Sequence, residues 1–358
     1  MTTMTTAAVC DAAGTAPTLQ QVQLAPLRHD EVLVRVVATG VCHTDVAWAD
    51  GEFLDVYPVV LGHESAGVVE AVGSAVSRVS VGQRVAIALS HHCGHCDYCE
   101  TSRPMLCERR TSAPPRFSRQ GQDLVQGFGS GGFSELTVVG EASTIPLPDH
   151  VPMAVAAVVG CATSTGLGAV FNIAEVQYGS TVLVLGAGGI GLNVIMGAAV
   201  AGAERIVVAE PDPARQKLAL GLGATDVCDP ELDVLRELEP RGFEYVFESV
   251  GLTGPMELAI KAAARGGTIT LIGAARPGAT FSVDALDFVP SQRRILGCLT
   301  GNVRPDLDFD RYFRLFARGM LPLDQLVTGA VPFAGIADGF ELCRTRQGIR
   351  TVVEITQE

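Results

Sequence analysis

The stretch that most constrains the fold is residues 181–215, TVLVLGAGGIGLNVIMGAAVAGAERIVVAEPDPAR. A run rich in β-branched residues leads into a glycine turn and an apolar helical pattern, and a second strand ends at Glu210. Glycines at G-x-G-x-x-G spacing let the backbone approach a pyrophosphate at the positive end of the helix, and the acid can bind the ribose. Together these features predict a dinucleotide-binding unit. Its turn consists of Gly186, Gly188, Gly189, Ile190 and Gly191.

Glu210 also bears on which dinucleotide binds. Its negative charge would repel a 2′-phosphate and predicts NAD, whereas the nearby Arg215 is able to accommodate that phosphate and leaves NADP open. The pattern continues with the strand-like runs FEYVFESVG and GGTITLIGAA, separated by the helical segment GPMELAIKAAARGG. This alternation is typical of a parallel doubly wound sheet, so the predicted fold class is α/β.

Length and charge set further limits. The 358 residues favour two domains over one, and 47% hydrophobic residues suffice for a large core. A formal net charge of -13 disfavours nucleic acid and anionic membranes as partners, which leaves small molecules. Residues 176–203 carry no charge over a membrane-spanning length, but their glycines suit a strand, turn and helix of a soluble core. The start, MTTMTTAAVCDAAG, lacks a signal-peptide pattern, so we expect a cytoplasmic protein.

Four cysteines lie together in CGHCDYCETSRPMLC, namely Cys93, Cys96, Cys99 and Cys107. Disulfides are disfavoured in the cytoplasm. Bacterial iron–sulfur runs place the fourth cysteine after three residues and follow it with proline, whereas here seven residues intervene and Glu108 follows. Zinc is therefore favoured. Four thiolates leave no open position on the ion, so we expect a structural site in a lobe at about residues 91–110.

A second set of metal-ligand residue types is scattered along the chain. Cys42 lies in TGVCHTD, His63 in VVLGHES and Cys161 in GCATSTG. A catalytic zinc needs three protein ligands and one exchangeable position, and two cysteines and a histidine from separate segments are one such set. Each residue alone is more often a packing residue. Their occurrence beside the cysteine cluster and the dinucleotide motif makes them candidates for a catalytic site.

Over nearly its whole length the chain resembles the zinc-dependent medium-chain alcohol dehydrogenases, and in style the aryl and allylic alcohol dehydrogenases among them. The resemblance rests on the four cysteines and on GVCHTD, GHE, GCATSTG, GAGGIG and GIRTVVEI. It implies a β-rich GroES-like catalytic domain, residues 1–162 and 300–358, split around a Rossmann domain at 163–299. It also implies an enzyme with two zinc ions that transfers hydride between an alcohol and NAD.

The resemblance assigns roles to individual residues. The three candidates above would hold the catalytic zinc, Asp45 would orient the histidine, and Glu64 would lie beside the metal. Thr44 would pass on the proton released by the alcohol. Thr165 and Arg350 would contact the nicotinamide and the pyrophosphate.

Two positions depart from the pattern of many liver-type members. An arginine follows the first zinc cysteine in those members, and here the position is His43. His43 would contact the pyrophosphate with fewer donors and with a pH-dependent charge. The histidine that ends the proton relay is replaced by Ala47. We therefore expect the proton to pass from Thr44 by way of the cofactor ribose to water.

The substrate pocket is expected to be apolar, which favours a hydrophobic primary alcohol or aldehyde, whether benzylic, allylic or aliphatic. Besides Thr44, its expected residues are Trp48, Phe53, Leu89, Ile272 and Ala274. A thiol adduct of formaldehyde is the alternative substrate, although the glutathione-dependent branch has an acid near Phe53 and an arginine near Thr111. A non-catalytic protein on the same fold is disfavoured because all three ligand types are present, and a zinc-free quinone reductase would lack both cysteine sets.

The remaining segments carry weaker predictions. Residues 109–132, rich in Gly, Pro and Ser, predict a loop without chemistry of its own. Residues 306–329 predict a helix and a loop of the catalytic domain. Strand-like segments near 281–300 would pair across a two-fold axis, so a homodimer or homotetramer is expected by analogy. Cys10, Cys228, Cys298 and Cys343 are expected to be small buried residues.

Overall fold

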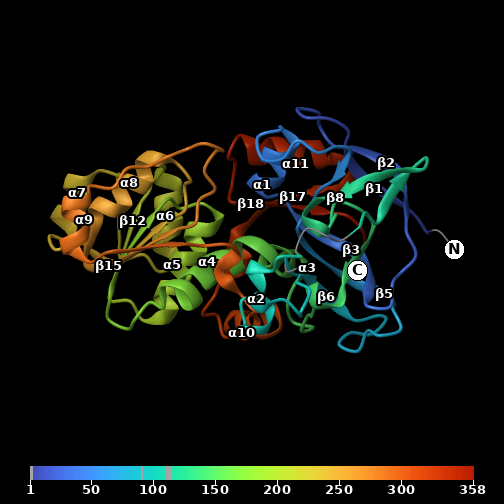
Figure 1. Cartoon of the computed structure of the whole chain (residues 1–358), viewed down its shortest axis with the longest axis horizontal. Coiled ribbons are helices and arrows are strands. Elements are labelled where there is room, and N and C mark those ends of the chain that lie inside the picture. Colours follow the sequence, from blue (N-terminus) through green and yellow to red (C-terminus); the bar gives the residue numbers. More distant parts are fainter. Residues whose placement is uncertain (1–2, 90–91, 110–113) are drawn as a thin grey trace. The chain divides into compact units, whose positions relative to one another are not determined.

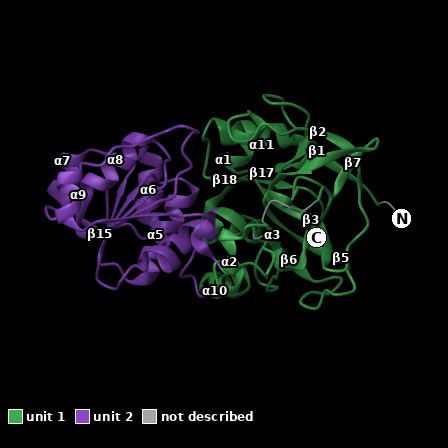
Figure 2. Cartoon of the chain, in the orientation of Figure 1, with its two compact units in different colours: residues 1–161, 304–317, 323–358 green, residues 162–303, 318–322 purple. Residues whose placement is uncertain are grey.

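The computed structural model describes residues 3–89, 92–109 and 114–358, and it divides the chain into two units (Figure 2). The first unit contains Met1–Cys161, Arg304–Ala317 and Leu323–Glu358, and the second contains Ala162–Val303 and Arg318–Pro322. The sequence placed the boundaries after residues 162 and 299. The structure divides the chain one residue earlier at the first boundary, and it keeps residues up to Val303 and a short later segment with the second unit.

The first unit contains a closed barrel and a seven-stranded sheet (Figure 1). The barrel consists, in order, of β1 (Thr3–Cys10), β2 (Thr18–Leu24), β7 (Phe117–Arg119), β8 (Gln122–Gln126) and β4 (Val59–Val60). The sheet consists, in order, of β10 (Thr144–Pro146), β6 (Arg84–Ile87), β5 (Glu64–Val72), β3 (Glu31–Gly40), β18 (Arg350–Glu354) and β17 (Val327–Pro332), with β9 (Leu136–Gly140) also paired with β3.

Strand β3 lies at the centre of this sheet because every second residue is an apolar side chain that faces the core. Val32, Val34 and Val36 are fully buried, as the period of two in a strand requires. The C-terminal strand β18 pairs antiparallel with β3, with Val352 opposite Gly40. This pairing brings the start of β18 to the end of β3, where the candidate site begins.

Short helices complete the first unit. They are α1 (His43–Ala49), α2 (Asp97–Glu100), α3 (Met153–Val158), α10 (Pro305–Ala317) and α11 (Ile336–Arg344), with the 3-10 helices η1 (Pro104–Leu106), η2 (Gly127–Gly129), η3 (Glu141–Ser143), η7 (Leu323–Leu326) and η8 (Phe333–Gly335). Helix α10 agrees with the helix predicted within residues 306–329, whereas the turn Arg318–Pro322 belongs to the second unit and the predicted loop ends where β17 begins at Val327.

The prediction of a loop at 109–132 was wrong for its middle part. Strands β7 and β8 form an antiparallel hairpin there, while residues 110–113 lie outside the described residues. The hairpin turns at Gln120 and Gly121, which both have positive φ. Two-residue hairpin turns of this kind match the twist of the flanking strands, so the same glycine that suggested a loop builds the hairpin.

The second unit is a six-stranded parallel sheet with helices. Its strand order is β13 (Asp226–Cys228), β12 (Arg205–Ala209), β11 (Thr181–Leu185), β14 (Phe243–Glu248), β15 (Ala263–Leu271) and β16 (Arg294–Gly297). The helices are α4 (Ser164–Gly168), α5 (Gly189–Ala201), α6 (Pro213–Gly221), α7 (Leu232–Leu238), α8 (Thr253–Ala262) and α9 (Ala285–Ser291), with the 3-10 helix η6 (Thr300–Asn302). Counted along the chain, the order is 3-2-1-4-5-6, the dinucleotide-binding arrangement that the glycine motif predicted.

The strand-like region at 281–300 is mostly not a strand. Only β16 of the strand-like region at 281–300 is a strand, because Asp284 accepts a hydrogen bond from the N–H of Leu286 and begins helix α9 instead. Among the described residues, one helix, Met153–Ala174, is long and apolar enough to cross a membrane, but 83% of its most apolar window is buried inside the protein. Because it is buried in this way, Met153–Ala174 is a core helix of the protein.

Candidate active site and metal centres

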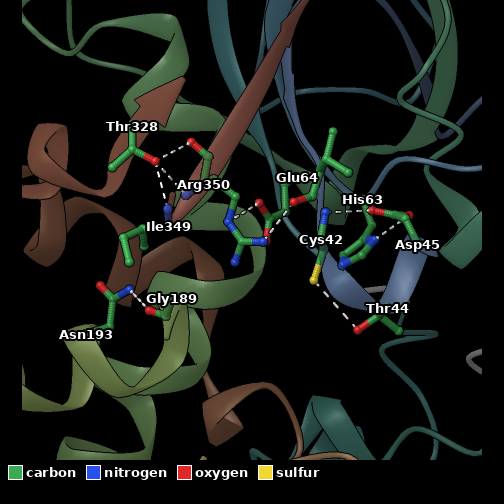
Figure 3. Close-up of polar contacts among 11 residues, drawn as sticks. Cys42, Thr44, Asp45, His63, Glu64, Gly189, Asn193, Thr328, Ile349 and Arg350 are labelled. Carbon is green, nitrogen blue, oxygen red and sulfur yellow. Dashed lines mark hydrogen bonds and ion pairs between the residues drawn. The ribbon is translucent and has the colours of Figure 1, made fainter. Parts of the chain in front are cut away.

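Four side chains from three separate segments converge in the first unit. Cys42, His63, Glu64 and Cys161 each offer one metal-ligating atom, and these atoms all lie within 4.8 Å of one another. Figure 3 draws the first three of these residues, with Cys42 between Thr44 and Glu64. The structure therefore brings together the residues that sequence spacing could not connect.

Local structure explains how each residue reaches the site. Cys42 is the N-cap of α1, two residues after the end of β3, and His63 directly precedes β5, which pairs with β3. Cys161 lies in a π-helical turn, Val159–Thr163, a helix irregularity that is common at functional sites. A Cβ on Gly160 would lie 2.6 Å from the carbonyl oxygen of Ile87 and 3.4 Å from that of His63. Only glycine therefore lets this turn approach the sheet closely enough.

Asp45 ties the first two segments together. It is fully buried, and its Oδ1 accepts hydrogen bonds from the N–H of Gly62 at 3.0 Å and lies 3.0 Å from Nδ1 of His63. Its Oδ2 accepts from the N–H of Cys42 at 3.2 Å. A ligating histidine commonly donates its second ring nitrogen to a carboxylate, which fixes the ring orientation. The contact is the one that the resemblance assigned to Asp45.

Glu64 and Arg350 form a buried ion pair beside the donors (Figure 3), with Nε of Arg350 3.3 Å from Oε2 of Glu64. The guanidinium also donates to the carbonyl of Val41 at 2.9 Å. Burial raises the pKa of Glu64 to about 7, and the charge of Arg350 opposes that rise. The sequence assigned Arg350 to a pyrophosphate. Its described partners within the first unit are the carboxylate of Glu64 and the carbonyl of Val41, and the pyrophosphate contact stays a prediction.

The donor set fits a zinc ion. Two thiols, an imidazole and a carboxylate are common zinc ligands, and donors around one tetrahedral zinc lie roughly 3.5–4 Å apart. The hydrogen bond between the two thiols lowers the pKa of Cys42 well below its ordinary value and raises that of Cys161. A metal ion binds thiolates, so its binding would remove the proton from each thiol.

The four clustered cysteines also fit an ion. The sulfur of Cys96 lies 3.5 Å from that of Cys99 and 4.0 Å from that of Cys107, and all cysteines are free thiols. A disulfide needs about 2.05 Å between sulfurs, whereas thiolates on one zinc lie about 3.8 Å apart. Backbone hydrogen bonds lower the pKa of Cys96 to about 6, and burial raises that of Cys99 to about 12.

The glycine turn of the second unit has the geometry expected for a dinucleotide. Gly186 has φ of +90°, and a Cβ on Gly191 would lie 1.9 Å from the carbonyl oxygen of Gly186. Glu210 directly follows β12, and its Oε2 accepts from the N–H of Ala187 at 2.7 Å while its Oε1 accepts from Asp212 at 3.0 Å. The carboxylate is therefore fixed against the turn.

Other predicted residues divide between the two units. Thr44 lies with its Oγ1 3.6 Å from Sγ of Cys42, and the His43 side chain is exposed in the first turn of α1. Leu89 is half-buried in the first unit.

The second unit holds Thr165, which is buried in α4, and also Arg215, Ile272 and Ala274. Arg215 pairs with Asp212, Ile272 directly follows β15, and Ala274 lies two residues further along the chain.

Phe128 was missed by the sequence analysis. Its ring packs against the His63 ring, with centroids 4.4 Å apart and planes 53° apart. Trp48 and Phe53, both predicted, pack against Phe128 in turn, and we call these three side chains the aromatic cluster. The sequence signal that could have identified Phe128 is an aromatic residue between two glycines, in the segment that was predicted to be a loop.

Comparisons with known proteins agree with this geometry. Residues 28–149 match the model of the alcohol dehydrogenase GroES-like domain, and residues 189–318 match that of the zinc-binding dehydrogenase domain. A relative from Escherichia coli, S-(hydroxymethyl)glutathione dehydrogenase, is 35% identical over 97% of this chain and 98% of its own length.

Solved structures are similar over the whole chain. An alcohol dehydrogenase zinc-binding domain protein from Burkholderia ambifaria has a TM-score of 0.95 at 31% identity, covering 100% of both chains. Benzyl alcohol dehydrogenase from Acinetobacter calcoaceticus has a TM-score of 0.93 at 30% identity, covering 99% of this chain and 100% of its own. The chain belongs to the zinc-dependent medium-chain alcohol dehydrogenase family, with GroES-like and Rossmann domains.

Proposed function

We propose that the protein transfers hydride between a hydrophobic primary alcohol, whether benzylic, allylic or aliphatic, and NAD. The observation that carries this proposal is the aromatic cluster packed against His63, because apolar rings beside the metal donors suit an apolar substrate. The likeness to a benzyl alcohol dehydrogenase supports the same substrate class.

The residues of the first unit would share the work. A zinc ion held by Cys42, His63 and Cys161 would supply positive charge that lowers the pKa of an alcohol, and NAD would accept hydride. Asp45 fixes the His63 ring, so that Nε2 is left free for a metal when Nδ1 donates its proton. Thr44 offers a hydroxyl beside Cys42 to accept the proton of the alcohol.

We also propose two zinc ions per chain, with the second held by the four clustered cysteines in a structural role. Glu64 would remain beside the catalytic ion. His43 and Arg350 would serve the pyrophosphate, Thr165 the nicotinamide, and Leu89, Ile272 and Ala274 the substrate.

A panel of alcohols tests the proposal. Initial rates of NADH formation should be measured with benzyl, cinnamyl, geranyl, hexyl and ethyl alcohols, with NAD and NADP in parallel. Activity on the aromatic and allylic alcohols with NAD, lost on chelation of zinc, is the expected result. Activity with formaldehyde plus a thiol, and with no simple alcohol, would overturn it.

A thiol adduct of formaldehyde is the second candidate substrate. The relative named S-(hydroxymethyl)glutathione dehydrogenase, at 35% identity, favours it. Phe53 stands near the position where that branch has an acidic residue, which weakens the case for glutathione itself and leaves other thiols open.

Thr44→Ala is expected to lower kcat roughly 10²-fold or more, because positioned proton transfer contributes that much. Thr44→Ser, which keeps a hydroxyl, should retain most activity and serves as the matched control. The measurement is kcat for benzyl alcohol from pH 6 to 10. Full turnover of the alanine variant across this range would remove Thr44 from the proton path.

Glu210→Ala is expected to weaken the preference for NAD over NADP roughly tenfold or more. Its carboxylate is held by two backbone N–H groups where it would repel a 2′-phosphate, and hydrogen bonds to a charged group contribute about 1.5–3 kcal/mol. The ratio of kcat/KM for the two cofactors is the measurement, with the exposed Glu237→Gln as control. An unchanged ratio would mean that other residues set the cofactor choice.

We further propose a cytoplasmic homodimer or homotetramer. Strand β16 forms an edge of the six-stranded sheet, and exposed apolar side chains precede it, with Leu286 85% and Val289 73% exposed. Edge strands and apolar patches commonly pair with another copy. Light scattering coupled to size exclusion would give the oligomeric state, and a monomer at micromolar concentration would refute this part.

A further inference from the structure

The aromatic cluster extends outward from the candidate metal centre. Phe128 contacts the His63 ring, and Trp48 meets Phe128 edge-on, with centroids 5.0 Å apart and planes at 87°. Phe53 lies 6.2 Å from Trp48 and 6.0 Å from Phe128. One phenyl ring therefore separates the imidazole from the indole.

The spacing of residues on α1 places Trp48 on the same face of the helix as Thr44. Thr44 and Trp48 are four residues apart on α1, so their side chains lie on one face of the helix. The Thr44 hydroxyl is 3.6 Å from the sulfur of Cys42. The indole thus lies on the face of α1 that carries the proton-accepting hydroxyl.

The indole N–H of Trp48 is a buried donor for which the described part of the chain offers no acceptor. Trp48 is 4% exposed, and its Nε1 has no hydrogen-bond partner among the described residues. The nearby Tyr57 hydroxyl does not serve it, because that hydroxyl donates to the main-chain carbonyl of Trp48. Buried tryptophan N–H groups normally have a partner, so an unpaired one beside a candidate active site needs an explanation.

Phe128 is held in an unfavourable backbone conformation. Its φ of 53° and ψ of 20° lie in the left-handed region, which costs free energy for a residue with a side chain. Such strain persists where surrounding structure enforces it, often at binding sites. The conformation aims the ring at His63 and makes it a fixed wall of the cluster.

We propose that the aromatic cluster selects an aromatic alcohol with an oxygen substituent on its ring, and that the indole N–H of Trp48 donates a hydrogen bond to this oxygen. The inference rests on the proposed function and narrows its substrate class. The substrate ring packs beside Phe128, and Phe53, which is 45% exposed, turns aside to admit the substituent.

The kinetic test compares substrates of equal shape. Values of kcat/KM are measured for 3- and 4-methoxybenzyl alcohol and for 3- and 4-ethylbenzyl alcohol, which lack the acceptor. The native protein is expected to prefer the methoxy compound about tenfold at one ring position, a difference of about 1.4 kcal/mol. Trp48→Phe keeps a ring but loses the N–H, so the ratio of kcat/KM for the methoxy compound over its ethyl counterpart should fall to about one, whatever the change in the two separate values.

Tyr57→Phe is the matched control, because it removes a hydroxyl next to Trp48 and leaves the indole intact. It should keep the methoxy preference. If Trp48 has a purely structural role, Trp48→Phe would lower kcat/KM equally for the methoxy and ethyl compounds and leave their ratio unchanged. That result would overturn the inference.

A binding measurement separates this inference from the proposed function. Trp48 is the only tryptophan in the chain, so intrinsic fluorescence reports on its indole alone. Without NAD there is no turnover, and the favoured methoxybenzyl alcohol should shift the emission to longer wavelength more than its ethyl counterpart. Equal shifts together with alcohol oxidation would overturn the inference alone. A selective shift without oxidation of any alcohol would support the hydrogen bond and overturn the proposed function.

Discussion

Cys161→Ala is expected to lower kcat/KM for benzyl alcohol roughly 10³-fold or more and to remove one of two zinc equivalents per chain. This loss should exceed the 10–100-fold loss of activity or metal affinity that is typical when only a residue hydrogen-bonded to a metal ligand is replaced. The ligating atom of Cys161 lies within 4.8 Å of those of Cys42 and His63. Removing it would leave the ion with one thiolate and one imidazole from the predicted set.

Two further variants define the scale of this effect. Asp45→Asn, which keeps the shape of the partner of His63, should cost roughly 10–100-fold in activity or metal affinity. Cys228→Ala, a half-buried cysteine of β13 with no place in either metal set, should change neither zinc content nor rate. Metal analysis and steady-state kinetics on the same preparations are the measurements. If Cys161→Ala kept both zinc equivalents and most activity, Cys161 would not be a zinc ligand.

The features that sequence predicted best are local ones. The glycine turn of the second unit could be predicted because its glycines, the helix that follows them and Glu210 all lie within one short segment. The cysteine cluster is equally local, since its four residues span 93–107. In both cases the residues that must meet are close along the chain, so spacing alone limits the possible geometry.

The hairpin of β7 and β8 shows where local reasoning fails. Its strands have three and five residues, too few for a clear alternation, and Gly121 reads equally as a loop residue or as a hairpin turn. Pairing with β2 and β4 in the barrel decides between the two. Such long-range pairing is not visible in a window of ten residues.

The candidate site required contacts between distant segments. Family resemblance connected Cys42, His63 and Cys161, but it gave no signal for Phe128, whose contact with His63 depends on the barrel bringing η2 back to the start of β5. The contact of Arg350 with Glu64 also joins segments that are far apart in the sequence. Strand β18 pairs with β3, and this register, rather than local sequence, places its guanidinium against Glu64.

Cys99→Ser is the second variant with a large expected effect, and it should destabilise the cysteine lobe while sparing the catalytic donors. The lobe has little structure of its own, because α2 has four residues and η1 has three, too few for stable isolated helices. Structural zinc supplies folding free energy directly, about 10–16 kcal/mol in small zinc-finger peptides. The variant should therefore contain one zinc equivalent and be cleaved by protease within residues 93–107, where the native chain resists cleavage.

The kinetics of the same variant test whether this lobe is structural. The four cysteine ligands leave no open position on an ion, so freshly purified Cys99→Ser should keep a kcat within a few-fold of the native value and lose it faster on heating. Cys228→Ser, a half-buried cysteine in neither metal set, is the control for the chemical change itself. Immediate loss of kcat with the remaining zinc still bound would contradict a structural role and tie the lobe to the chemistry. Unchanged zinc content and protease resistance would instead remove Cys99 from the ligand set.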